Sequence, residues 1–251
     1  MLRHISSSAL LVAVLIAWEL GVLLSGVSPL VLPAPSAVTE TLWDGLVSGA
    51  LWQHLWVTGA ETLLGFVLGC VIGFLIGAIL AEMPRLRRLL WPYVLASQVV
   101  PKLALGPIFI IWFGFGITST VIITALICFF PLLENTITGL SNVPQEKRDL
   151  FRMLGATRLQ TLLRLKLPTS MPVILAGIRV ALVLALVGAV VGEFIAGSKG
   201  LGASIIAAQG MMDTTLIFAL FILITLMGLF FYQIIVVIER RILQSRQKGT
   251  F

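Results

Sequence analysis

The chain has 251 residues, of which 59% are hydrophobic and 11% are charged, and its mean hydropathy is +1.08. This composition excludes an ordinary soluble domain and indicates a protein embedded in a membrane. The 17 Lys and Arg residues outnumber the 11 Asp and Glu residues, but the cations are dispersed among short polar segments. That dispersal argues against nucleic acid as a partner.

Six apolar runs are long enough to cross a membrane, since a helix needs about 20 apolar residues to span the hydrocarbon core. We expect the first to be an uncleaved span rather than a signal peptide, because its apolar stretch is longer than a signal core. The chain is therefore predicted to be an all-α polytopic membrane protein, with one domain over residues 1–251. The runs are 8–26, 57–81, 93–116, 118–140, 173–196 and 216–238.

The cations predict the orientation of these spans. With the N-terminus inside the cell, the segments facing the cytoplasm hold 14 of the 17 Lys and Arg residues. The positive-inside rule therefore predicts that the N-terminus and the C-terminus are both cytoplasmic.

Two local patterns occur in the first half of the chain. The sequence LPAPS at 32–36 predicts an extended turn, after which Ser36 can cap a short helix through Val47. In the second span, a glycine ladder made of Gly65, Gly69, Gly73 and Gly77 lies on one helix face. Such a ladder predicts close contact with another helix, either in this chain or in a second subunit.

Charged residues inside the spans are the candidates for a translocation pathway: Lys102, Glu134, Arg179 and Glu193. Lys102 follows Pro101 in the third span, and Pro101 and Pro107 are expected to disturb that helix. Its ammonium either lines a wetted cavity, where it can contact substrate, or snorkels to the interface.

The other buried charges fall at two depths. Glu134 and Arg179 are each about 10 Å from the cytoplasmic boundary and are predicted to form an ion pair. Glu193, like Glu61, lies toward the outer side, where a wetted vestibule or a ligand site are both open interpretations.

The longest polar interruption is the segment 141–171, which lies between two long apolar runs. It has helical periodicity, a glycine at Gly155 and a predicted helix stop at Leu167-Pro168, so we interpret it as a docking surface rather than a simple connection. Its six cations are Lys147, Arg148, Arg152, Arg158, Arg164 and Lys166.

The spacing in this segment resembles the EAA motif of ABC importer permeases, E-A-A-x3-G-x9-I-x-L-P. Here an acid and two apolar residues, Asp149-Leu150-Phe151, stand at the E-A-A positions, and Leu165 stands for the isoleucine. The resemblance implies that residues 141–171 form a cytoplasmic coupling loop, whose helix sits in a groove of the ATPase subunit. The residues it assigns to coupling are Asp149, Gly155, Ala156, Thr157, Leu165, Leu167 and Pro168.

Further motifs are similar to one branch of these permeases, which includes nitrate, taurine and sulfonate transporters. The motifs are LPAPSAV at 32–38, WFGFG at 112–116, FFPLLENT at 129–136 and GLG at 200–202. The resemblance implies a type I-like permease core that works by alternating access in a bacterial inner membrane. It also implies an ATPase dimer, a second permease subunit (as a homodimer) and an external binding protein, with no cofactor or metal. Oxoanions and pyrimidine or flavin precursors are the substrate classes it suggests.

Two other functional classes fit the sequence less well than a permease does. An intramembrane enzyme is not expected, because no Ser/His dyad, no pair of intramembrane aspartates and no H-E-x-x-H motif is present. An ion-coupled secondary transporter is the alternative, but it leaves the 141–171 segment without a role. The chain has no G-x-x-x-x-G-K-[ST] motif, so ATP is expected to be hydrolysed by a separate chain.

Overall fold

The computed structural model describes the backbone of residues 2–248, with the side chains of 2–8, 103 and 245–248 left out of the description. Within this range the chain is helical and contains no β-strand, which confirms the all-α prediction. The elements are α1 (Leu2–Ser25), α2 (Pro35–Val47), α3 (Ala50–Glu82), α4 (Pro84–Val99), η1 (Lys102–Leu105), α5 (Gly106–Phe113), α6 (Ile117–Ser141), α7 (Gln145–Met153), α8 (Arg158–Thr161), η2 (Leu162–Lys166), α9 (Leu167–Ala196), α10 (Leu201–Gly210) and α11 (Thr214–Lys248).

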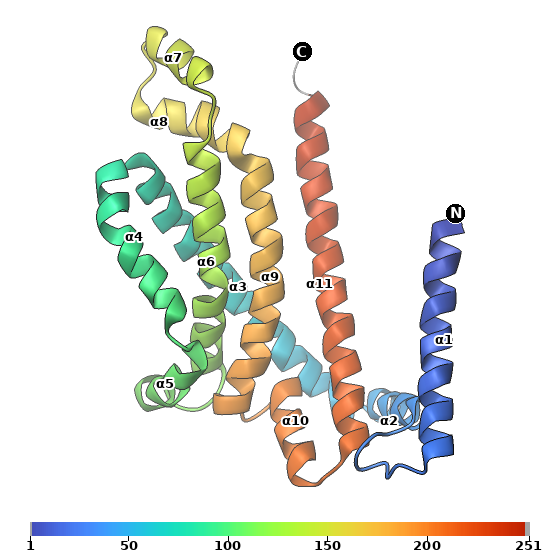
Figure 1. Ribbon diagram of the computed structural model, residues 1–251. Helices are drawn as coiled ribbons and strands as arrows, with labels where there is room; N and C mark the ends of the chain where they lie inside the picture. Colours follow the sequence, from blue (N-terminus) through green and yellow to red (C-terminus); the bar gives the residue numbers. More distant parts are fainter. Residues whose placement is uncertain (1, 249–251) are drawn as a thin grey trace.

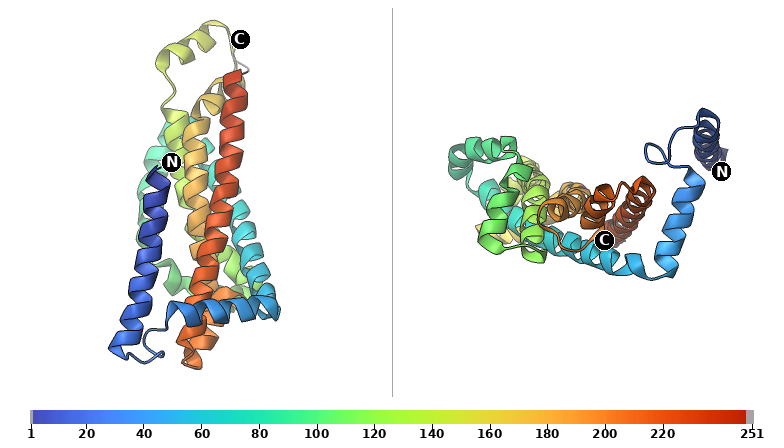
Figure 2. Two further views of the ribbon diagram at one scale, coloured as in Figure 1. Left: turned by 90° about the vertical axis from the view of Figure 1, so that its right-hand side faces the viewer. Right: turned by 90° about the horizontal axis from the view of Figure 1, so that it is seen from below.

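The long helices run roughly side by side, and the short ones gather at the two ends (Figure 1). Helices α7 and α8 lie at the end where α3 finishes and α9 begins, whereas α2, α5 and α10 lie at the opposite end (Figure 1). Helix α1 begins, and helix α11 ends, toward the same end of the molecule as α7 (Figure 1). Figure 2 shows from two further directions that α1 stands at the edge of the molecule.

The centre of the fold is the contact of α3, α6 and α9, and the glycine ladder of α3 makes it close. A Cβ atom at Gly69 would lie 2.6 Å from Cys128 Sγ and 2.7 Å from the Ala125 carbonyl oxygen, both on α6. At Gly73 it would collide with the backbone of Phe129, again on α6. The predicted helix contact is therefore confirmed, and its partner is α6 of the same chain.

Four helical segments in the described residues are long and apolar enough to cross a membrane: Ala50–Glu82, Ile117–Ser141, Arg158–Ala196 and Thr214–Gln244. They match four of the six predicted spans, and shorter apolar helices occur at Ala9–Ser25 and Leu201–Gly210. The structure thus confirms a protein of several apolar helices, while the count of six spans stays a prediction.

The third predicted span is not one continuous helix. Helix α4 ends at Val99, Val100 is extended with ψ of 123°, and η1 and α5 follow. Val100 precedes Pro101, and a residue before proline is pushed out of the helical region. The expected disturbance at Pro101 is therefore confirmed. After α5, the Gly116 N–H donates to the Ala196 carbonyl at 2.8 Å, which fixes the WFGFG turn against the end of α9.

The predicted helix after the LPAP turn is present and ends at Val47, but Ser36 does not cap it. The Ser36 hydroxyl instead donates to Glu19 Oε1 at 2.7 Å, and its backbone N–H donates to Glu19 Oε2 at 3.0 Å. Helix α2 begins at Pro35, whose missing N–H needs no cap. Ser36 thus joins α2 to α1.

Candidate functional site

The predicted coupling loop contains two short helices joined by a tight turn. Helix α7 ends at Met153, and Gly155 has a φ of +70°, in the left-handed region that favours glycine. The Gly155 N–H donates to the Arg152 carbonyl and the Ala156 N–H donates to the Phe151 carbonyl, each at 3.0 Å. This pair of bonds is a Schellman motif, so the glycine in the EAA-like spacing is the C′ residue of α7.

A capping box starts α8 immediately after this turn. The Gln160 N–H donates to Thr157 Oγ1 at 3.2 Å, and the Thr157 N–H donates to Gln160 Oε1 at 2.8 Å. The sequence carries the signal for this box as Thr157-x-x-Gln160, whereas the EAA-like spacing points only to Thr157. The two motifs together fix the angle between α7 and α8.

The predicted helix stop at Leu167-Pro168 is wrong, because the chain continues from α8 into α9 without a break. A π turn, η2, joins them, and the Leu167 N–H donates to the Leu162 carbonyl five residues earlier. The wider turn accommodates Pro168, which cannot donate and would crowd a regular helix. Leu165 is buried, with 7% of its surface exposed. Residues 167–171 therefore belong to the long helix α9 rather than to the loop.

The acidic residue at the start of the motif lies on the surface of α7. Asp149 is 3.7 Å from Arg152, and the side chains are 48% and 86% exposed respectively. Such an exposed pair contributes little stability. Asp149 is therefore available for contact with another chain.

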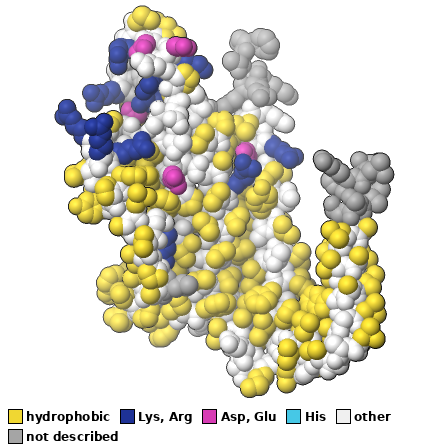
Figure 3. All heavy atoms as spheres, viewed as in Figure 1, with side chains coloured by type: hydrophobic (Ala, Val, Ile, Leu, Met, Phe, Trp, Pro, Cys, Tyr) yellow, Lys and Arg dark blue, Asp and Glu magenta, His cyan; other side chains and the backbone are white. Residues whose placement is uncertain are grey.

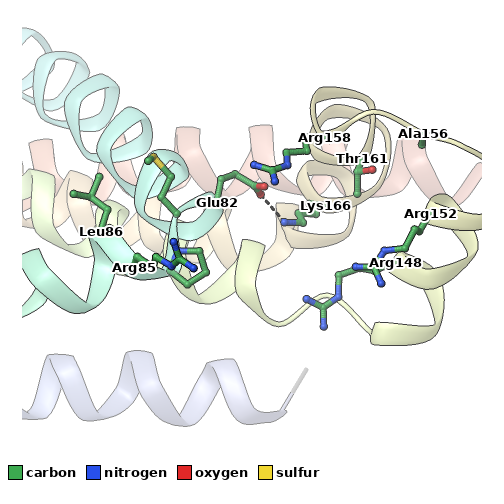
Figure 4. A pocket seen from close by; sticks show the side chains of 11 residues that line it. Glu82, Arg85, Leu86, Arg148, Arg152, Ala156, Arg158, Thr161 and Lys166 are labelled. Carbon is green, nitrogen blue, oxygen red and sulfur yellow. Dashed lines mark hydrogen bonds and ion pairs between the residues drawn. The ribbon is translucent and has the colours of Figure 1, made fainter.

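A cleft of about 940 Å³ separates the loop from the end of α3 and the start of α4 (Figure 4). One ion pair crosses it, with Lys166 Nζ 2.6 Å from Glu82 Oε1, and ties η2 to α3. Sequence reasoning missed Glu82, since no local pattern links residues 84 positions apart. The lining residues are Glu82, Met83, Pro84, Arg85, Leu86, Arg148, Arg152, Ala156, Arg158, Thr161 and Lys166.

The predicted ion pair between Glu134 and Arg179 is wrong. Arg179 Nε lies 3.0 Å from Glu239 Oε2 on α11, while Glu134 is exposed on α6. Depth estimated along a helix axis does not give the direction in which a side chain points, and α11 supplies the nearer carboxylate. Glu239 was not a candidate in the sequence because it lies beyond the last predicted span.

Lys102 lies at the break between α4 and α5 and is half-buried. Its Nζ donates to Gln98 Oε1 on the last turn of α4 at 3.2 Å. The ammonium is thus held beside the irregular backbone of the third span.

Glu193 and Glu61 meet in the interior rather than in an open vestibule, and each is 1% exposed. The Thr58 hydroxyl donates to Glu193 Oε1 at 2.6 Å, and the Gly202 N–H donates to Oε2 at 2.5 Å. A Cβ atom at Gly200 would collide with this carboxyl group. The GLG motif therefore brings backbone close to Glu193, which fastens α10 to α3 and α9.

Comparison with known proteins places this fold in a family. Residues 69–244 match the family described as "Binding-protein-dependent transport system inner membrane component". The chain is 41% identical over 230 residues to the riboflavin transport system permease protein RibX of Chloroflexus aurantiacus, covering 92% of this chain and 86% of RibX. It is 35% identical to the putative aliphatic sulfonates transport permease protein SsuC of Bacillus subtilis, covering 94% of this chain and 86% of SsuC.

Two further similarities agree with this placement. The chain is 32% identical to the formylaminopyrimidine transport permease protein ThiX of Halalkalibacterium halodurans, over 93% of each chain. A chain of the inward-facing MetNI methionine ABC transporter has the same fold, with a TM-score of 0.66 and 18% identity, over 78% of this chain and 97% of that one.

This chain belongs to the binding-protein-dependent transport system inner membrane components, the permeases of ABC importers. The resemblance to the sulfonate and taurine branch is confirmed. The family is not enzymatic: ATP is hydrolysed by a partner ATPase, and a substrate-binding protein belongs to the same transporter. Membership in this family sets aside the ion-coupled secondary transporter.

Proposed function

We propose that this chain is the permease of a bacterial inner-membrane importer that assembles as two permeases, two ATPases and an external binding protein. The observation that carries the proposal is the loop formed by α7, α8 and η2, in which a Schellman motif and a capping box hold the turn between α7 and α8. It projects at one end of the molecule and continues directly into α9 (Figure 1). A projection that is continuous with a central helix is suited to transmit movement from a partner.

The coupling residues have distinct roles in this proposal. Asp149 presents an acid to the ATPase groove, while Gly155, Ala156 and Thr157 hold α7 at a fixed angle to α8. Leu165, Leu167 and Pro168 form the join to α9. Closure of the ATPases on ATP displaces α7 and α8, and α9 carries that displacement to the α3 and α6 helices packed against it.

The proposed orientation puts α7 and both chain termini in the cytoplasm. The spans that complete the six are then α1 and the broken segment made of α4, η1 and α5. Helices α2 and α10 lie at the outer end, where the binding protein delivers its ligand. The chain 1–251 acts as one domain, and residues 141–166 form its cytoplasmic loop.

The substrate proposed is a small organic solute of the class named for its relatives: a flavin, a pyrimidine precursor or a sulfonate. The 41% identity to a riboflavin permease supports the first of these. Thr58 and Gly202 already engage Glu193, and Glu239 engages Arg179, which leaves Lys102 and the exposed Glu134 among the four pathway candidates. Of these two, Lys102 is the one that lies beside the break in the third span, so we assign it to the pathway. Irregular backbone at membrane depth is tolerated where it lines a cavity.

A Lys102→Cys variant tests whether residue 102 lines a cavity that opens alternately to the two sides of the membrane. The background carries Cys70→Ala and Cys128→Ala, and the permease is reconstituted with its ATPases and binding protein. A small water-soluble thiol reagent should modify residue 102, and the rate should change when ATP closes the ATPases, because the cavity alternates between the two sides. Met211→Cys, which lies exposed just after α10 at the end away from α7, should react at one rate in every state. A thiol at 102 that never reacts would contradict the pathway assignment.

A further inference from the structure

The cleft between the loop and the α3–α4 turn has an excess of positive charge. Five cations line it, Arg85, Arg148, Arg152, Arg158 and Lys166, against one carboxylate, Glu82. Glu82 is already engaged by Lys166 at 2.6 Å. Among the described residues, no ion pair supplies an acid to Arg85, Arg148 or Arg158.

Arg148 is the clearest sign of an unfilled interaction. Its Nε atom is buried and has no hydrogen-bond partner among the described residues. A guanidinium nitrogen removed from water without an acceptor is costly, and nothing in the described chain neutralises this group. Arg148 as a whole is only half-buried and lines the cleft, so the outer part of its side chain is open to a ligand oxygen. Figure 4 shows Arg148 and Arg152 facing the cleft from one side, with Arg85 and Glu82 across from them.

An apolar surface begins directly beside this charge. Leu89, one turn and about 6 Å along α4 from Arg85, is 64% exposed, and Tyr93 on the next turn is 70% exposed. Met83 and Leu86 bring apolar surface into the cleft itself. Figure 3 shows the Lys and Arg side chains of this end bordering a surface that is mostly hydrophobic. A ligand that fills the cleft and follows α4 must be anionic at one end and apolar at the other.

We propose that this basic cleft binds the phosphate of an anionic phospholipid, with the acyl chains lying along α4. Arginine is suited to the task because its planar fork donates two hydrogen bonds to phosphate oxygens. Basic pockets between membrane helices on the cytoplasmic side are sites for acidic headgroups. The apolar surface of α4 favours a lipid over an acidic protein segment, which needs no such surface. The site goes beyond the proposed transport function and relies only on its placement of α7 in the cytoplasm.

The test measures which lipids bind to the permease when it is purified together with its ATPase subunits. After delipidation, phosphatidylglycerol and phosphatidylcholine are added back, and bound lipid is counted by native mass spectrometry. The wild type should retain phosphatidylglycerol in preference, and Arg148→Gln/Arg158→Gln should weaken that binding about tenfold. The matched control, Arg240→Gln/Arg241→Gln, removes the same charge from α11 and should bind like the wild type. Thermal unfolding of each variant checks that it is folded.

Three outcomes would overturn the proposal. Equal retention of the two lipids by the wild type would show that the cleft does not select an anionic headgroup. Displacement of phosphatidylglycerol by inorganic phosphate alone would assign the cleft to a free oxoanion. Loss of the ATPase subunits from the cleft variant, with lipid binding unchanged, would make the cleft a protein contact. Because lipid is counted without ATP or substrate, failure here leaves the transport assignment standing.

Discussion

Replacing Gly155 by valine is expected to abolish most ATP-driven uptake while the membrane helices remain folded. Gly155 has a φ of +70°, and a side chain in this left-handed conformation costs about 1–2 kcal/mol, with more expected for a β-branched residue. A cost of that size lowers the population of the native turn, relative to other conformations of the loop, by a factor of about 5–30. Helices α7 and α8 then lose their fixed angle, and uptake into proteoliposomes should fall by a similar factor.

Gly155→Asn is the matched control, because asparagine tolerates the left-handed region better than other non-glycine residues. Apart from the two chain neighbours, no described atom lies within 4 Å of a Cβ atom placed at Gly155, so the Cβ itself meets no steric obstacle there. Asparagine should therefore keep most of the uptake. Wild-type uptake by the valine variant would show that the turn does not transmit movement.

Replacing Gly69 by leucine is expected to separate α3 from α6 and to lower stability strongly. The Cβ alone would lie 2.7 Å from the Ala125 carbonyl oxygen, and a backbone atom can yield only if the whole of α6 moves. Overpacking of this kind costs about 1–3 kcal/mol, and leucine adds atoms beyond the Cβ. The midpoint of thermal unfolding in detergent should fall below that of the wild type.

Gly21→Leu provides the comparison, since, apart from its chain neighbours and the helix's own backbone, no described atom comes within 4 Å of a Cβ atom placed at Gly21 on α1. That variant should unfold at the wild-type temperature. Equal midpoints for the two variants would mean that the glycine ladder does not determine the α3–α6 contact.

Much of this fold is encoded in local patterns. The glycine ladder predicted a close helix contact because its spacing alone places four glycines on one face. The Gly155 spacing and the Thr157-x-x-Gln160 pattern carry the Schellman motif and the capping box, since both depend on hydrogen bonds between near neighbours. The break at Pro101 follows from proline's effect on the preceding residue.

The contacts between distant parts of the chain were not predictable in the same way. The ladder did not identify α6 as its partner, and nothing near Lys166 in the sequence points to Glu82. Depth along the helices predicted Glu134 as the partner of Arg179. The direction of each side chain around its helix decides the partner, however, and Arg179 faces Glu239 on α11. Pro168 was expected to stop a helix, but a single π turn accommodates it. Glu193 is held by Thr58, 135 positions away in the sequence.

The most direct test of the coupling assignment uses two exposed methionines at opposite ends of the molecule. Met153 ends α7 and is 79% exposed, and Met211 follows α10 and is 78% exposed. A benzophenone amino acid is placed at one position or the other in the assembled transporter, and the adducts are identified after illumination. We expect position 153 to cross-link to the ATPase and position 211 to give no ATPase adduct. An ATPase adduct at 211, with none at 153, would contradict both the docking role of α7 and the orientation of the chain.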